Sequence, residues 1–166
     1  GSSATSDANP VKRGEYLVTI GGCNDCHTPK KLGPMGPELD LSRMLSGHAA
    51  SEAVPPPPSD GFGMGKWMAA CNANMTAWLG PWGVSFAANL TPDNLTGSGA
   101  WTEQSFIDAL RKGKHLGSGR PILPPMPWQY FSQMTDDDLK AVFAYLRSIP
   151  AIPNQVPQPI PPASGL

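Results

Sequence analysis

The sequence is poor in charge and lacks long hydrophobic runs, and each of these features excludes a class of protein. Charged residues make up only 15% of the chain, and the formal net charge is −1. Because no basic run or stripe occurs, a nucleic-acid partner is not expected. No stretch approaches the ~18 consecutive apolar residues of a membrane-spanning helix, so no transmembrane segment is predicted in this chain.

The chain also opens without a secretory signal, because no basic segment, apolar run and small-residue cleavage site follow one another there. Its 166 residues suit one domain with a sizeable core, and two full domains would be cramped. The 20 prolines and 18 glycines indicate a loop-rich protein, short of the content expected of full disorder.

Two of the three cysteines lie in one short motif, Cys23-Asn24-Asp25-Cys26-His27. The C-x-x-C-H pattern is the attachment signature of a c-type haem. Cysteines three residues apart face the same side of a helical turn, so both sulfurs reach one macrocycle. The motif therefore predicts one covalently attached haem c, with thioether bonds from Cys23 and Cys26 and His27 as the proximal iron ligand. A thioredoxin-like pair would need a βαβ pattern, and a zinc site would need a second Cys/His pair.

Covalent haem attachment in bacteria takes place outside the cytoplasm, so the chain is predicted to be periplasmic or otherwise extracytoplasmic. We therefore expect a mature form without its signal peptide, and the full-length protein can carry a membrane anchor. Gly1-Ser2-Ser3 is either a cloning remnant or a lipoprotein spacer.

The third cysteine, Cys71, leaves three interpretations open. The favoured one is a buried, small apolar side chain. The others are an intermolecular disulfide and an alternative iron ligand.

Capping residues mark three helices clearly. Asn9 with Pro10, Thr102 and Thr135 each precede an apolar pattern of helical period. Gly14 lies inside the first helix, where either a close helix crossing or plain tolerance accounts for it. The expected helices span about 9–20, 102–113 and 135–150, with shorter ones over 40–46 and, for a turn or two, over 66–73.

The segments between these helices are rich in proline and glycine. Either Gly33-Pro34 or Gly36-Pro37 is expected to bring a backbone carbonyl to the second ring nitrogen of His27, since metal-bound histidines need such an acceptor. The run Pro55–Pro58 is expected to be a stiff spacer. Residues 59–88 show no clean helical or strand period.

The sixth iron ligand is predicted to be Met126, which lies in Pro124-Pro125-Met126-Pro127. The prolines fix the backbone, so the loop presents one thioether with little entropy left to lose. Met134, one residue before a helix cap, is expected to be a packing residue, and His115 a solvated surface histidine. The remaining candidates are His48, five further methionines and Cys71.

Several motifs together resemble a class I, monohaem c-type cytochrome. They are Cys23-x-x-Cys26-His27, Met126-Pro127 and a final helix with Ala144-Tyr145-Leu146. Further motifs are similar to the cytochrome c modules of bacterial membrane-bound alcohol and sugar-acid dehydrogenases, over roughly residues 10–34 and 80–150. These motifs are Asn89-Leu90-Thr91-Pro92, Thr96-Gly97, Gly99-x-Trp101 and Phe106 to Gly113.

The chain departs from that subfamily in two ways. It has one C-x-x-C-H motif, where the dehydrogenase subunits carry several. The segment between His27 and Met126 is also longer than in a minimal class I cytochrome, which indicates an insertion over residues 38–88.

The resemblance implies an all-α cytochrome c fold, with the first and last helices crossing at right angles and the haem in a cleft. A loop-rich Pro/Gly insertion would separate the haem motif from the third helix. We expect a single domain over residues 1–166, with a haem-binding core at about 9–150 and a proline-rich extended tail at 151–166. Gly14 and Tyr16 are expected to meet Leu139, Phe143 and Tyr145.

The predicted function is that of a one-electron carrier with His27 and Met126 as axial ligands, and not of an enzyme in its own right. Its partner would be a redox protein on either the dehydrogenase or the terminal oxidase side, with this chain as the electron-accepting subunit or domain of a dehydrogenase as one case. The alternative is a haem-based ligand binder or sensor, or a haem enzyme, with an open or Cys-ligated sixth site. The basic residues between 111 and 120 either steer an acidic partner or complement a helix end.

Overall fold

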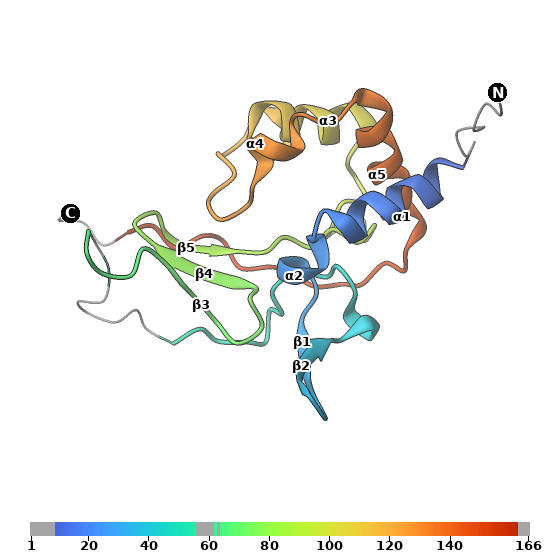
Figure 1. Cartoon of the computed structure of the whole chain (residues 1–166). Helices are drawn as coiled ribbons and strands as arrows, with labels where there is room; N and C mark the ends of the chain where they lie inside the picture. Colours follow the sequence, from blue (N-terminus) through green and yellow to red (C-terminus); the bar gives the residue numbers. More distant parts are fainter. Residues whose placement is uncertain (1–8, 56–61, 63, 163–166) are drawn as a thin grey trace, which may run out of the picture.

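The computed structural model describes residues 9–55, 62 and 64–162, which form a group of helices joined to two small antiparallel sheets (Figure 1). The expectations for residues 1–3, 56–58 and 163–166 fall outside the described residues. In chain order the elements are α1 (Pro10–Ile20), α2 (Cys23–His27), β1 (Lys30–Gly33), β2 (Gly36–Leu39), a 3-10 turn (Leu41–Arg43), β3 (Ala70–Cys71), β4 (Ala77–Gly80), β5 (Gly83–Phe86), α3 (Glu103–Lys112), a second 3-10 turn (His115–Gly117), α4 (Trp128–Phe131) and α5 (Asp136–Ser148).

The all-α fold class expected from the sequence is wrong, because the described residues form a mixed α/β structure. Strands β1 and β2 make one hairpin, and β3, β4 and β5 make a three-stranded sheet. Both sheets lie in the segment expected to be loops. No helix forms over residues 66–73, where β3 occurs instead, and the helix expected over 40–46 is only the 3-10 turn Leu41–Arg43.

The two hairpins share a turn sequence, G-P-x-G, which is compatible with proline at the turn. Gly33 pairs with Gly36 in the first hairpin, and Gly80 pairs with Gly83 in the second. The second glycine of each turn has a positive φ, 113° at Gly36 and 94° at Gly83. Proline presets φ at the first central position of such a turn. Because the strands are at most four residues long, no period of two is visible in the sequence.

The three clearly marked helices are confirmed, together with their caps. The side chain of Asn9 accepts hydrogen bonds from the backbone of α1. Thr102 caps α3 in a reciprocal capping box with Ser105, and Thr135 caps α5. Gly113 ends α3 with φ of 66°, a left-handed conformation in which glycine carries no steric cost.

Helices α1 and α5 pack closely across Gly14, as the close-crossing interpretation of this glycine predicts. A Cβ atom at Gly14 would lie 2.0 Å from the backbone oxygen of Ala141 and 2.7 Å from Cβ of Tyr145. Tyr16, which was also expected to meet α5, is 53% exposed. Around this crossing lies the main core. Most of its buried members come from α1, α3 and α5 and include Leu17, Val18, Phe106, Ile107, Leu139, Val142, Phe143 and Leu146.

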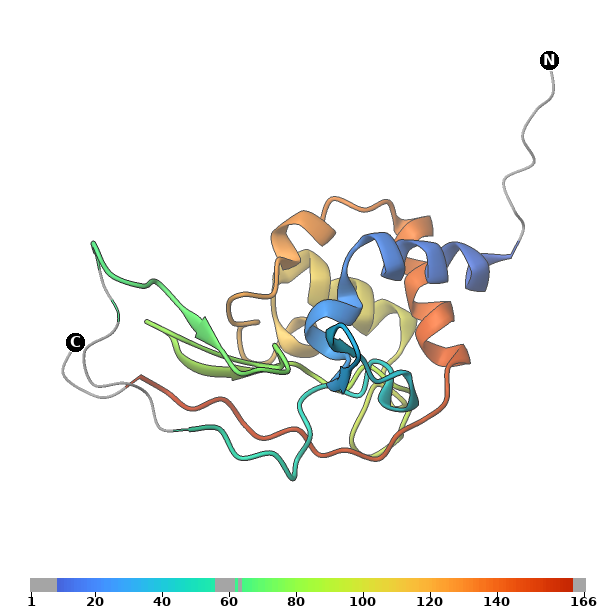
Figure 2. The same ribbon diagram turned by 60° about the horizontal axis from the view of Figure 1, so that its bottom comes forward.

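The tail runs back along the insertion in extended conformation, as Figure 2 shows. Val84 of β5 and Ile160 exchange two backbone hydrogen bonds of 2.8 and 2.9 Å. The tail thereby covers an edge of the three-stranded sheet and joins it to the end of α5. Among the described helices, none has the length and apolar character needed to cross a bilayer.

Candidate functional site

The C-x-x-C-H motif forms α2, a single helical turn that follows α1 directly. Gly22 makes the junction with φ of 69°, a left-handed conformation that glycine adopts without strain. Cys23 and Cys26 thus lie three residues apart on one turn, where their side chains share a face. Cys23 is partly buried and packs against the main core.

Both thiols of the motif are disfavoured as thiolates. Burial raises the pKa of Cys23 to about 11, and it also raises the pKa of Cys26. Reactive redox cysteines have a lowered pKa instead, because the thiolate is the nucleophile. The surroundings of α2 therefore argue against a thioredoxin-like pair.

One nitrogen of the His27 ring is fixed by a backbone carbonyl. Nδ1 of His27 lies 2.8 Å from the carbonyl oxygen of Ala88. Because a carbonyl only accepts, Nδ1 donates, and Nε2 carries the free lone pair of the neutral ring. Burial lowers the pKa of His27, which favours that neutral form. The backbone N–H of Gly47 also donates to the carbonyl of His27, at 2.8 Å.

The acceptor expected for His27 was wrong. Gly33, Pro34 and Gly36 form the turn of the β1–β2 hairpin, while the carbonyl at His27 comes from Ala88, just beyond β5. Ala88 lies 61 residues from His27 along the chain. An alanine carbonyl carries no side-chain signal, so the sequence does not single it out as the acceptor.

Met126 lies in the loop that leads into α4 and is partly buried against the main core. With Ile122 and the neighbouring residues 124–130 it lines a pocket of about 230 Å³. The loop is supported at its end by Trp128, whose ring packs on Gly113; a Cβ atom there would lie 2.4 Å from the ring. Since Cys23 and Met126 border the same core, α2 and the Met126 loop are held by one group of helices.

The segment after α4 is fixed to α3 through Arg111. Its guanidinium donates to the carbonyls of Ser132 and Met134 and pairs with Asp136 at 2.7 Å. Met134 itself is partly buried against the core, in agreement with a packing role.

The two other histidines have surroundings that explain them without a ligand. His48 is fully buried, and both ring nitrogens are engaged, Nδ1 with Thr76 Oγ1 and Nε2 with the carbonyl of Glu52, each at 2.9 Å. His115 is exposed and stands edge-on to Trp101, with ring centroids 5.0 Å apart.

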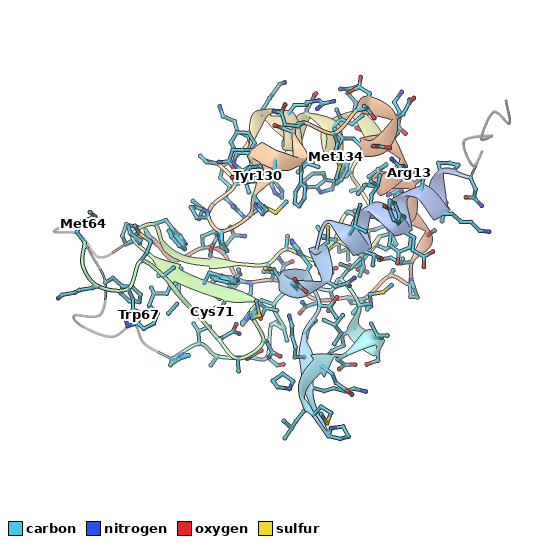
Figure 3. All side chains as sticks on the ribbon, viewed as in Figure 1. Arg13, Met64, Trp67, Cys71, Tyr130 and Met134 are labelled. Carbon is cyan, nitrogen blue, oxygen red and sulfur yellow. The ribbon has the colours of Figure 1, made fainter. Side chains whose placement is uncertain are left out.

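The expectation that Cys71 is buried is wrong, because its side chain is exposed in the short strand β3. Figure 3 shows Cys71 in the sheet, whereas Met134 lies among the helices in another part of the molecule. Cys71 is near enough to α2 that its negative form raises the pKa of Cys26. Among the described residues, no group of three or more His, Cys, Asp or Glu side chains is placed to hold a metal ion.

Comparison with known proteins gives several relatives with informative names. The chain is 26% identical over 147 residues to the cytochrome c subunit of alcohol dehydrogenase (quinone) from Gluconobacter oxydans. This match covers 87% of this chain and 23% of that protein. It is 30% identical over 135 residues to the gluconate 2-dehydrogenase cytochrome c subunit of Pantoea cypripedii, covering 81% and 22%. It is 25% identical over 143 residues to the fructose dehydrogenase cytochrome subunit of Gluconobacter japonicus, covering 86% and 22%.

The chain thus spans about a quarter of the length of these relatives while most of its own residues are matched. No family model matches the chain.

Proposed function

We propose that this cytochrome c module, a homologue of the cytochrome subunits of alcohol, gluconate and fructose dehydrogenases, is a one-electron carrier with one covalently attached haem c. The observation that carries the proposal is the helical turn Cys23–His27 with the ring of His27 fixed by Ala88. When bound, the haem supplies the Fe(III)/Fe(II) couple. We assign Cys23 and Cys26 to the thioether bonds and His27 and Met126 to the axial positions.

The side chains of Cys23, Cys26 and His27 fit a covalently attached haem. The two cysteines share one helical turn, and attachment adds each thiol across a vinyl group, with sulfur bonding to one carbon and the thiol proton going to the other. No oxidant is consumed. Protonated thiols, as expected from the raised pKa of Cys23 and Cys26, already carry the proton that this addition transfers. His27 presents a neutral Nε2, the form in which imidazole binds metals.

The roles of the two axial ligands follow from their supports. The carbonyl of Ala88 holds the tautomer of His27 and raises the basicity of Nε2. Met126 offers a soft thioether from a loop in which prolines limit backbone freedom. A thioether opposite histidine favours the reduced iron and raises the reduction potential.

The partner we propose is a dehydrogenase subunit that donates electrons, because the named relatives are subunits of such enzymes. The site of action would then be extracytoplasmic. Of the basic residues considered for docking, Arg111 is engaged with Asp136, and Lys112 lies 3.8 Å from Asp108. These two residues therefore support α3 and its neighbours rather than a partner surface.

An optical spectrum tests the proposal directly. The chain is produced in a host that attaches haem c, and the spectrum is taken oxidised, reduced and with CO. A low-spin spectrum with the weak near-infrared sulfur-to-iron band, unchanged by CO, supports the carrier. A high-spin ferrous haem that binds CO at once would overturn Met126 as ligand and favour sensing or catalysis.

A further inference from the structure

Strand β5 and the residues just after it contact both sides of the proposed site. The hydroxyl of Ser85 donates to the carbonyl of Pro124 at 2.6 Å, in the loop that carries Met126. The carbonyl of Ala88, three residues further on, accepts from Nδ1 of His27 at 2.8 Å. Figure 1 shows β5 running between α2 and the loop that leads into α4.

We propose that the segment Ser85–Ala88 is a brace that sets the position of one axial ligand relative to the other, and that Ser85 is a positioning residue for Met126. This inference rests on the proposed function. In an extended chain the two contacts are about 10 Å apart along the segment, at roughly 3.3 Å per residue. The insertion is then a part of the site rather than an addition to it.

The contact of Ser85 is a directed one. Ser85 is buried, and its single hydroxyl proton faces Pro124 O at 2.6 Å, far closer than Trp78 O at 3.4 Å. The indole Nε1 of Trp82 donates to the same hydroxyl at 3.1 Å. The three groups form a chain from Trp82 through Ser85 to Pro124, and each hydrogen bond polarises and strengthens the next.

The brace itself is held on both flanks. Strand β5 is paired with β4, with Ser85 opposite Trp78. The residue just before Ala88 is tied on both of its backbone groups, because Ala87 N–H donates to Thr76 O at 2.8 Å and Ala87 O accepts from His48 N–H at 3.0 Å. A segment fixed in this way transmits position instead of yielding to the loop.

The Met126 loop needs an anchor of this kind. Prolines at 124, 125 and 127 have no backbone N–H to donate. The backbone bonds of Met126 are local, its N–H to Leu123 at 3.3 Å and its carbonyl from Trp128 at 2.9 Å. Ser85 therefore supplies a link from a different part of the fold.

The test measures how firmly the sulfur ligand is held in the ferric holoprotein. Imidazole is titrated against the sulfur-to-iron band in the wild type and in Ser85→Ala, Ser85→Thr and Ser98→Ala. Ser98 is the matched control, a buried serine whose hydroxyl also donates to backbone carbonyls, those of Leu90 and Thr91. We expect Ser85→Ala to lower the half-displacing imidazole concentration about tenfold, the effect of one lost hydrogen bond. Ser85→Thr, which keeps the hydroxyl, and Ser98→Ala should stay close to the wild type.

A wild-type value in Ser85→Ala, or an equal shift in Ser98→Ala, would overturn the inference. If Ser85→Ala yields no holoprotein, Trp82→Phe removes the indole donor and keeps a smaller aromatic side chain, and a shift of about threefold is expected; no shift then decides against the brace. Failure of the proposed function looks different. In that case the wild type lacks the band, or Met126→Ala retains it.

Discussion

Met126 and Met134 lie close together in the sequence, but their surroundings differ. Met126 lines a pocket from a loop that prolines stiffen. Met134 precedes the Thr135 cap, and its carbonyl is held by Arg111 at 2.7 Å. A residue in that position contributes packing to the start of α5.

Replacing these two methionines separates the roles. Met126→Ala should abolish the sulfur-to-iron band, lower the reduction potential and allow the ferrous protein to bind CO. Met134→Ala should keep all three properties and instead lower the free energy of unfolding by about 1–3 kcal/mol, since a partly buried thioether is lost. Spectra and denaturant titrations of both variants check this. The opposite assignment would appear as loss of the band in Met134→Ala alone.

Cys71 differs from the motif cysteines in its exposure. An exposed thiol in a two-residue strand is open to reagents, whereas Cys23 and Cys26 are partly buried and, in the proposed holoprotein, alkylated. We expect native holoprotein to react with one equivalent of a thiol reagent and Cys71→Ser with none. The spectrum of Cys71→Ser should equal that of the wild type. A changed ferric spectrum would instead identify Cys71 as an iron ligand.

At the scale of elements, the crossing of α1 and α5 depends on the absence of a side chain at Gly14. In an exposed helix, replacing glycine by alanine stabilises by about 1 kcal/mol. At Gly14 the new Cβ would lie 2.0 Å from the backbone oxygen of Ala141, which cannot move without shifting α5. At Gly14 the replacement by alanine should therefore destabilise the protein instead of stabilising it.

We expect Gly14→Ala to lower the free energy of unfolding by about 1–3 kcal/mol, as overpacked cores do. Lys12→Ala, on the exposed face of the same helix, should change it by less than about 0.5 kcal/mol. Thermal or denaturant unfolding of the two holoproteins gives both values. A stabilised Gly14→Ala variant would show that the helices separate easily at this point.

The elements that sequence analysis finds are those whose signals are local. Three helices are predicted by their capping residues, Asn9, Thr102 and Thr135. In each case the cap and the apolar residues at helical spacing lie within one short stretch of sequence. The hairpins were missed since their strands are too short for a period, although G-P-x-G at 33–36 and 80–83 marks both turns. The site divides in the same way. Cys23, Cys26 and His27 form one motif, whereas the Ala88 carbonyl reaches His27 only through the fold.

On the scale of the whole molecule, the tail ties the insertion to the helical part. Asn154 is the central contact: its Nδ2 donates to the carbonyls of Ser46 at 2.8 Å and His48 at 2.9 Å, and its Oδ1 accepts from Ala50 N–H at 2.9 Å. Asn89 donates to the carbonyl of Ile152 at 2.8 Å. Residues 46–50 and Asn89 are thus both hydrogen-bonded to the extended tail.

Asn154→Asp tests this attachment of the tail with a nearly isosteric change. The variant keeps the acceptor for Ala50 N–H but turns two donated hydrogen bonds into contacts between a carboxylate oxygen and two carbonyls. We expect the free energy of unfolding to fall by about 2–4 kcal/mol at pH 7, from two lost bonds and the unpaired groups left behind. Gln155→Glu is the matched control, since it makes the same change at the adjacent, exposed residue and should cost less than about 0.5 kcal/mol.

The variant also has a predicted pH dependence. A carboxylate facing carbonyls has a raised pKa, because protonation restores a donor. The deficit of Asn154→Asp relative to the wild type should therefore shrink as the pH falls through that raised pKa, above the ordinary value of about 4. Denaturant titrations of the wild type, Asn154→Asp and Gln155→Glu at several pH values measure this. If both variants lose the same free energy of unfolding at every pH, the added negative charge accounts for the effect and the lost amide donor does not. The hydrogen bonds of Asn154 would then contribute nothing to holding the tail on the insertion.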